Sequence, residues 1–145
     1  MGLLLLCNGG FMILSAIVSG LYNDGATLEI SFAGITTIFV GILLMYGTKN
    51  HKKEIKKREG YMIVSFGWVF MTISGMLPYL FTGSIPSVTN AFFETMSGYT
   101  TTGASILNDI EVLPEGILFW RSTTHWIGGM GIIVLAIAIL PLLGI

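Results

Sequence analysis

Charged residues are scarce in this sequence: they make up 10% of its 145 residues, whereas hydrophobic residues make up 53%. A soluble domain of this size needs far more charge on its surface. The composition therefore excludes a soluble globular protein and predicts an integral membrane protein embedded in a lipid bilayer. The formal net charge of −1 gives no indication of a nucleic-acid partner.

Cysteine is nearly absent, since Cys7 is the only one in the chain. An intrachain disulfide is excluded, and a single cysteine in an apolar segment is best interpreted as a small packing residue. The sequence also lacks a cluster of metal ligands and a glycine-rich phosphate-binding loop. We therefore expect no cofactor.

Two long apolar runs begin the chain, and each has about 20 residues, enough to cross a membrane as a helix. A short turn at Tyr22–Gly25 joins them, so the pattern predicts an N-terminal transmembrane helix pair over residues 1–48. The first run has some features of a signal peptide. No basic residue precedes it, however, and no clear cleavage pattern ends it, so we interpret it as a retained span.

The segment 49–60 holds six of the seven basic residues of the chain. Basic residues in short loops between membrane spans concentrate on the cytoplasmic side, so this segment is predicted to be a cytoplasmic loop. A basic patch that binds nucleic acid is the competing interpretation. The shortness of the loop and the spans on both sides argue against it.

The remainder, 61–145, has the pattern of a span, a short helix and another span. Residues 61–82 form a third predicted span, which Pro78 interrupts near its end, and residues 117–144 form the last. Between them, segment 106–116 is too polar to span and predicts an outer loop. With the basic loop inside, five acidic residues lie on the outer side, where they raise the local concentration of cations: Asp24, Glu29, Asp109, Glu111 and Glu115.

Residues 87–105 predict a pore helix followed by an ion-selectivity filter. Val88 to Ser97, if helical, rises about 15 Å, which is half of a hydrocarbon core of about 30 Å, so the helix must re-enter rather than cross. Its C-terminal end would place the negative end of the helix dipole near a bound cation.

The filter is predicted to comprise Thr100, Thr101, Thr102, Gly103 and Ala104. Successive backbone carbonyls in such a segment can replace the water that a potassium ion sheds. Gly103 permits the backbone angles this requires, and the threonine hydroxyls add oxygens and anchoring hydrogen bonds. The alternative is that Thr-Thr-Thr-Gly is an ordinary polar loop between two membrane helices.

Four further polar side chains need an explanation inside a membrane. A carboxylate in the pore helix is costly without partners, so Glu94 is expected to accept hydrogen bonds behind the filter and, with Gly98, to support it rather than bind the ion. Arg121 is expected to reach toward the membrane interface, and the alternative is that it pairs with an acidic loop residue or with Glu94. Ser122 and His125 share a helix face, but no orienting carboxylate or oxyanion loop accompanies them, so we do not expect an enzyme.

Three stretches together resemble a known family, the Trk/Ktr/HKT superfamily of potassium transporters, and in particular its TrkH-type uptake subunits. The first is residues 57–60, and the second is residues 91–94 with 97–104 at the filter. The third is residues 119–122 with 125–136, and it includes Trp-Ile-Gly-Gly-Met-Gly. The filter alone is a moderate signal, but the filter followed by this glycine-containing run is highly specific.

The resemblance implies an all-α membrane protein in which a transmembrane hairpin precedes a potassium-channel-type unit of helix, re-entrant pore helix with filter, and helix. It further implies potassium uptake across the bacterial cytoplasmic (inner) membrane by a multi-pass subunit with four such repeats, of which this chain resembles the N-terminal portion. Carried onto matching residues, it assigns potassium coordination to Thr101 and Thr102. The implied partners are a cytosolic nucleotide-binding regulatory subunit and a second copy of the subunit. The alternative is a non-conducting membrane scaffold or assembly fragment.

Overall fold

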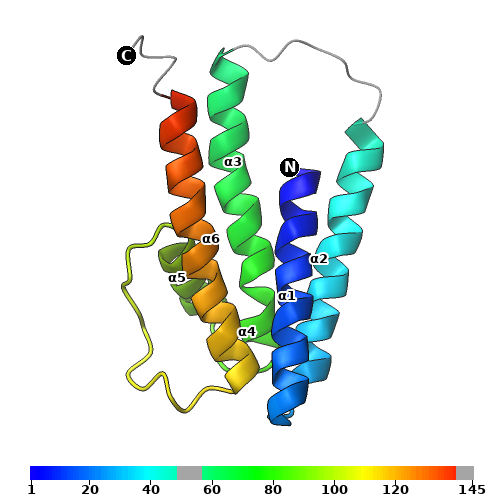
Figure 1. Cartoon of the computed structure of the whole chain (residues 1–145), viewed down its shortest axis with the longest axis vertical. Helices are drawn as coiled ribbons and strands as arrows, with labels where there is room; N and C mark the ends of the chain where they lie inside the picture. Colours follow the sequence, from blue (N-terminus) through cyan, green and yellow to red (C-terminus); the bar gives the residue numbers. More distant parts are fainter. Residues whose placement is uncertain (49–56, 140–145) are drawn as a thin grey trace.

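The computed structural model describes residues 1–48 and 57–139, and this part of the chain contains helices and no strand (Figure 1). The order of the elements is α1 (Gly2–Tyr22), α2 (Thr27–Thr48), α3 (Lys57–Gly75), α4 (Leu77–Phe81), α5 (Val88–Tyr99) and α6 (Glu115–Ile139). The predicted all-helical fold is confirmed. Most of the predicted cytoplasmic loop, and the end of the predicted last span, lie outside the described residues.

Three stretches of the described residues are long and apolar enough to cross a membrane: Gly2–Tyr22, Thr27–Gly47 and Val64–Phe81. They correspond to the first three predicted spans. α3 begins at Lys57 rather than at residue 61, because lysine, arginine and glutamate are good helix formers and extend the helix into the basic segment.

The helices α1 and α2 form an antiparallel pair, called here the N-terminal hairpin. Their backbones approach closely where glycines face each other: a side-chain carbon added at Gly9 would lie 2.9 Å from the carbonyl oxygen of Gly34. Such small residues allow helices to pack tightly inside a membrane. The small residues Ser15, Ala16 and Ser19 of α1 are also buried.

The third predicted span is divided near the proline, as expected. α3 ends at Gly75, and α4 begins at Leu77 with Pro78 in its first turn. Since proline has no N–H and its ring crowds the preceding turn, it is tolerated in the first turn of a helix but not in the interior of one, and the helix is interrupted just before it. After α4 the chain enters the loop that leads to α5.

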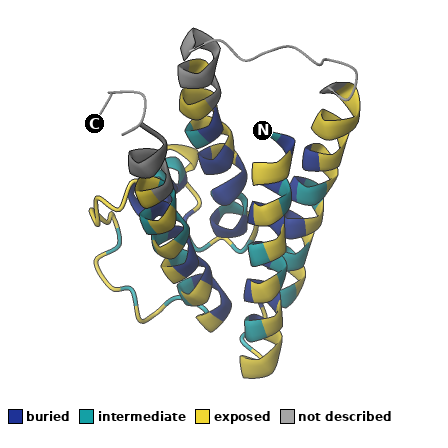
Figure 2. Cartoon of the chain, turned by 45° about the horizontal axis from the view of Figure 1, so that its top comes forward, coloured by how far each residue is buried: buried dark blue, intermediate teal, exposed yellow. Residues whose placement is uncertain are grey.

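The hydrophobic core lies where the N-terminal hairpin, α4, α5 and α6 meet. Figure 2 shows buried positions concentrated on the facing sides of the helices, with exposed ones along their outer sides. The buried core side chains are those of Met12, Ala16, Ala26, Ile30, Ala33, Tyr79, Ile85, Ala91, Ile117 and Trp120. Many large apolar side chains are exposed, which is the pattern of a chain that faces lipid or other protein.

Candidate functional site

The short helix α5 is held between α3 and α6 by close backbone contacts. A side-chain carbon added at Gly128 of α6 would lie 2.9 Å from the carbonyl oxygen of Gly98 and closer still to that of Tyr99. One added at Gly98 would lie 2.5 Å from Oγ1 of Thr124. Only glycine fits at these positions, so α6 touches the backbone of the C-terminal end of α5 directly.

The C-terminal end of α5 closes with two backbone hydrogen bonds that cap its last carbonyls. The N–H of Thr101 donates to Gly98 O at 3.0 Å, and the N–H of Thr102 donates to Ser97 O at 3.0 Å. This pair of bonds is the Schellman motif, which places one residue in the left-handed conformation. That residue is Thr101, with φ of 55°.

A left-handed threonine is unusual, because its branched side chain crowds the backbone in this region. The sequence pointed to Gly103 as the residue with special backbone angles, and it does have φ of 75°. Thr100 and Thr101 belong to the cap of α5. The described segment without helix or turn structure begins at Thr102.

All five predicted filter residues, Thr100 to Ala104, are exposed. The hydroxyl of Thr100 donates to Met96 O at 2.8 Å and also lies 2.8 Å from Oγ1 of Thr102. The Thr101 hydroxyl donates to Thr100 O at 2.7 Å. The threonine hydroxyls therefore hold this turn together, and the segment presents its oxygens on an open surface of the chain.

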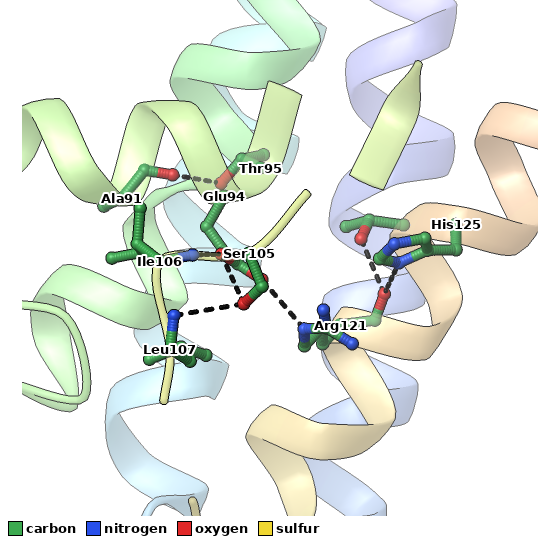
Figure 3. A network of polar contacts seen from close by, with 9 residues as sticks. Ala91, Glu94, Thr95, Ser105, Ile106, Leu107, Arg121 and His125 are labelled. Atoms are coloured by element: carbon green, nitrogen blue, oxygen red, sulfur yellow. Dashed lines mark hydrogen bonds and ion pairs between the residues drawn. The ribbon is translucent and has the colours of Figure 1, made fainter. Parts of the chain in front are cut away.

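Glu94 of α5 is the centre of a polar cluster that ties the segment after the predicted filter to α6 (Figure 3). Its carboxylate accepts hydrogen bonds from the Ser105 hydroxyl at 3.0 Å to each oxygen and from Ile106 N at 3.0 Å. Arg121 Nε donates to Oε1 at 2.9 Å. Backbone and hydroxyl donors of this kind were expected for Glu94, whose side chain is 1% exposed.

Arg121 does not follow the favoured interpretation, in which it reaches toward the membrane interface, but the alternative, in which it pairs with Glu94. Its side chain is only 18% exposed and forms an ion pair with Glu94. A guanidinium is the natural partner for a buried carboxylate, because the pair cancels the charge that burial penalises. The neighbouring His125 uses its Nδ1 in a 2.9 Å hydrogen bond with Arg121 O, and Ser122 is exposed.

A second buried polar cluster, which the sequence analysis did not single out, joins α1, α3 and α5. The Tyr99 hydroxyl donates to Asn8 Oδ1 at 2.5 Å, and Asn8 Nδ2 donates to Ser74 Oγ at 2.8 Å. Asn8 and Tyr99 are both fully buried. The available signal was an amide within an apolar span, which requires internal partners. We name it the Asn8 cluster.

The turn between α1 and α2 also contacts the start of α6. Asp24 accepts hydrogen bonds from the backbone N–H of Ala26 at 3.0 Å and of Gly116 at 2.8 Å, and from the Ser19 hydroxyl. Burial raises the pKa of Asp24, but the hydrogen bonds from Ser19, Gly116 and Ala26 outweigh it, so the pKa lies below its usual value. Asp24 thus caps α6 rather than acting only as a free surface charge.

Comparison with known proteins assigns the chain to a family. Residues 27–145 match the family of cation transport proteins named TrkH. The chain is 43% identical over 145 residues to the Trk system potassium uptake protein TrkH of Salmonella typhimurium, covering 99% of this chain and 30% of that protein. It is 36% identical over 136 residues to the Trk system potassium uptake protein TrkG of Escherichia coli, covering 92% of this chain and 28% of that protein.

A solved structure shares the fold. The crystal structure of the potassium transporter TrkH from Vibrio parahaemolyticus matches with a TM-score of 0.90 and 44% identity, covering 99% of this chain and 31% of that one. The chain thus spans about 30% of the length of the relatives it matches. With a match over most of its residues and the same helical fold, the chain belongs to the TrkH family of cation transport proteins.

Proposed function

We propose that this chain forms part of a pore for potassium uptake, with α5 as a re-entrant pore helix and Thr100–Ala104 as one part of its selectivity filter, called here the filter strand although Thr100 and Thr101 also cap α5. The names of the TrkH and TrkG relatives, which are potassium uptake proteins, support this proposal. The function is transport, and no residue is proposed to catalyse a chemical reaction.

The observation that carries the proposal is the shortness of α5 together with the exposure of the segment after it. The 12 residues of α5 rise about 18 Å, too little to cross a hydrocarbon core of about 30 Å. Its C-terminal end is buried between α3 and α6, while the next five residues are exposed. Irregular backbone at membrane depth is tolerated only against protein or a watery cavity, and a water-filled pore provides that cavity.

Within this pore Thr101 and Thr102 coordinate potassium, and Thr100, Gly103 and Ala104 complete the strand. The ion loses water on entry, and oxygens of the strand replace it as one part of a ring. Glu94 and Gly98 support the strand from behind: Glu94 holds residues 105 and 106, and Gly98 lets α5 lie against α6. The rest of the ring comes from outside these 145 residues.

By resemblance to the family, we place the protein in the bacterial inner membrane as a multi-pass subunit. A cytosolic nucleotide-binding regulatory subunit and a second copy of the subunit are the proposed partners. Three membrane-length stretches in the described residues and the exposed apolar side chains support the membrane location.

Two glycines in the chain allow a matched test of the filter. Gly103 has φ of 75° and Gly83, in the loop between α4 and α5, has φ of 68°, and a side-chain carbon added at either meets nothing within 4 Å. Alanine therefore introduces similar backbone strain at both positions without a clash. Gly103→Ala and Gly83→Ala should lower stability alike and differ only in their effect on ion passage.

The measurement is rubidium and potassium uptake into potassium-starved bacteria that lack their own uptake systems, with the complete reading frame that contains this chain. We expect Gly103→Ala to reduce uptake at least about tenfold at equal membrane abundance, since misaligned oxygens no longer replace the ion's water. Gly83→Ala should transport normally. Equal uptake by both variants would refute the filter assignment, and no uptake by the parent protein would favour the scaffold alternative.

A further inference from the structure

The Asn8 cluster connects the N-terminal hairpin to the residue that immediately precedes the proposed filter. Tyr99 is the last residue of α5, and its hydroxyl donates to Asn8 Oδ1 at 2.5 Å. Asn8 itself is fixed by its second bond, in which Nδ2 donates to Ser74 Oγ at 2.8 Å. Ser74 in turn donates to Met71 O at 2.9 Å, so each member of the cluster is anchored to backbone or to another helix.

Burial makes this arrangement specific. Asn8 and Tyr99 are both 0% exposed, and neither polar group can exchange its partner for water. A buried donor or acceptor that loses its partner bears the full cost of desolvation, so the chain is held in the conformation that keeps both bonds. The cluster therefore determines the position of the Tyr99 side chain relative to α1 and α3.

The position of that side chain also determines the orientation of the backbone after it. On one side, the Tyr99 hydroxyl lies 2.8 Å from the position that a side-chain carbon at Gly75 would take, so the ring occupies space in front of α3 that only a glycine leaves free. On the other side, Gly128 of α6 packs against the Tyr99 carbonyl oxygen. The side chain and the carbonyl of one residue are thus held by different helices, and the next residue is Thr100.

We infer that Asn8 is a positioning residue for the filter: through Tyr99 it sets the rotation of the C-terminal end of α5 and hence the direction of the next carbonyls along the chain. Asn8 does not contact the ion. The inference rests on the proposed function, and it assigns the N-terminal hairpin a part in ion discrimination, in addition to membrane anchoring.

The test is a double-mutant cycle in the complete reading frame that contains this chain. Asn8→Leu leaves the Tyr99 hydroxyl buried without an acceptor, and Tyr99→Phe leaves Asn8 Oδ1 without a donor. The double variant removes both groups, a change that is often nearly neutral for stability. Ser15→Ala is the control, because Ser15 is equally buried in α1 but its hydroxyl donates within the same helix, to Phe11 O at 3.0 Å.

The readouts are the KM and Vmax of potassium uptake, the inhibition of uptake by sodium, and the amount of protein in the membrane. We expect each single variant to raise the KM for potassium, or to lower potassium-over-sodium discrimination, by about threefold to tenfold at equal abundance, the range expected for loss of one hydrogen bond. In the double variant, the change in KM or in discrimination relative to the parent should be smaller than the product of the two single-variant changes. Ser15→Ala should have the KM and the discrimination of the parent.

Unchanged KM and sodium inhibition in both single variants, with only lower abundance or Vmax, would show that the cluster serves packing alone and would overturn the inference. Independent effects of the two substitutions would overturn it as well. If the parent protein takes up no potassium, the proposed function fails and the positioning role fails with it. Parent uptake with unaltered discrimination in the variants refutes the positioning role only.

Discussion

Replacing Arg121 by methionine should destabilise the protein strongly, and a second substitution at Glu94 should restore part of the loss. The Glu94 carboxylate is 1% exposed and the Arg121 side chain 18% exposed, so Arg121→Met leaves a buried negative charge without its counter-ion. Breaking a buried ion pair in this way costs about 3–5 kcal/mol. The bonds from Ser105 and Ile106 remain, which places the expected loss near the lower end of that range.

The double variant Glu94→Gln with Arg121→Met contains no uncompensated charge. The amide oxygen of glutamine can still accept from Ser105 or Ile106, so the cost should fall to about 1–3 kcal/mol, that of imperfectly satisfied buried polar groups. The double variant should thus be more stable than Arg121→Met alone. Glu94→Gln alone should also cost about 1–3 kcal/mol, because Arg121 loses its counter-charge but keeps some access to solvent.

The assay is equilibrium unfolding of the purified protein in mixed detergent micelles, with the three variants and the parent measured side by side. Folded helical content gives the midpoint, and the free energies give a coupling energy for the pair. A double variant that is less stable than Arg121→Met would contradict the reasoning, because it would mean that the uncompensated Glu94 charge is not the source of the loss. Additive single effects would also contradict it.

Two further predictions concern packing and pH. Gly128→Ala should lower the free energy of unfolding by about 1–3 kcal/mol or more, since the added carbon would overlap the carbonyl oxygen of Tyr99. In Gly129→Ala the added carbon meets nothing within 4 Å, so this variant should be neutral or stabilising. The abundance of folded protein in detergent distinguishes the two. Because the pKa of Asp24 is lowered in the folded state, its contribution to stability is present above the usual value of 3.8 and is lost as pH falls below it. Unfolding midpoints measured from pH 6 to pH 3 should therefore fall less in Asp24→Asn than in the parent, and identical pH profiles would contradict the role assigned to the Asp24 carboxylate.

The spans and the short helix were predictable because local patterns determine them. Apolar runs of membrane length, a half-length run before Thr100, and a proline near residue 78 are all visible without tertiary information. The need of Glu94 for donors was also predictable, since a carboxylate in an apolar helix has few alternatives. Its donors Ser105 and Ile106 lie further along the same stretch of chain.

The contacts that the sequence left open or did not indicate join residues far apart in the chain. Arg121 pairs with Glu94 across 27 positions, and Tyr99 bonds to Asn8 across 91. Nothing local distinguishes an arginine that pairs in the interior from one that extends to the interface. The left-handed backbone of Thr101 was missed for another reason: helix capping imposed it on a residue whose side chain disfavours it, while the sequence directed attention to Gly103.

The bond from Asp24 to Gly116 N–H has a consequence for the order in which the chain is assembled. It joins residues 92 positions apart, and synthesis at about 5–20 residues per second delivers Asp24 about 5–20 seconds before Gly116. The turn of the N-terminal hairpin can therefore be complete when the start of α6 leaves the ribosome. When the first turn of α6 forms, the Asp24 carboxylate is then already in place to accept its N–H, so the hairpin provides a folded surface against which α6 can pack.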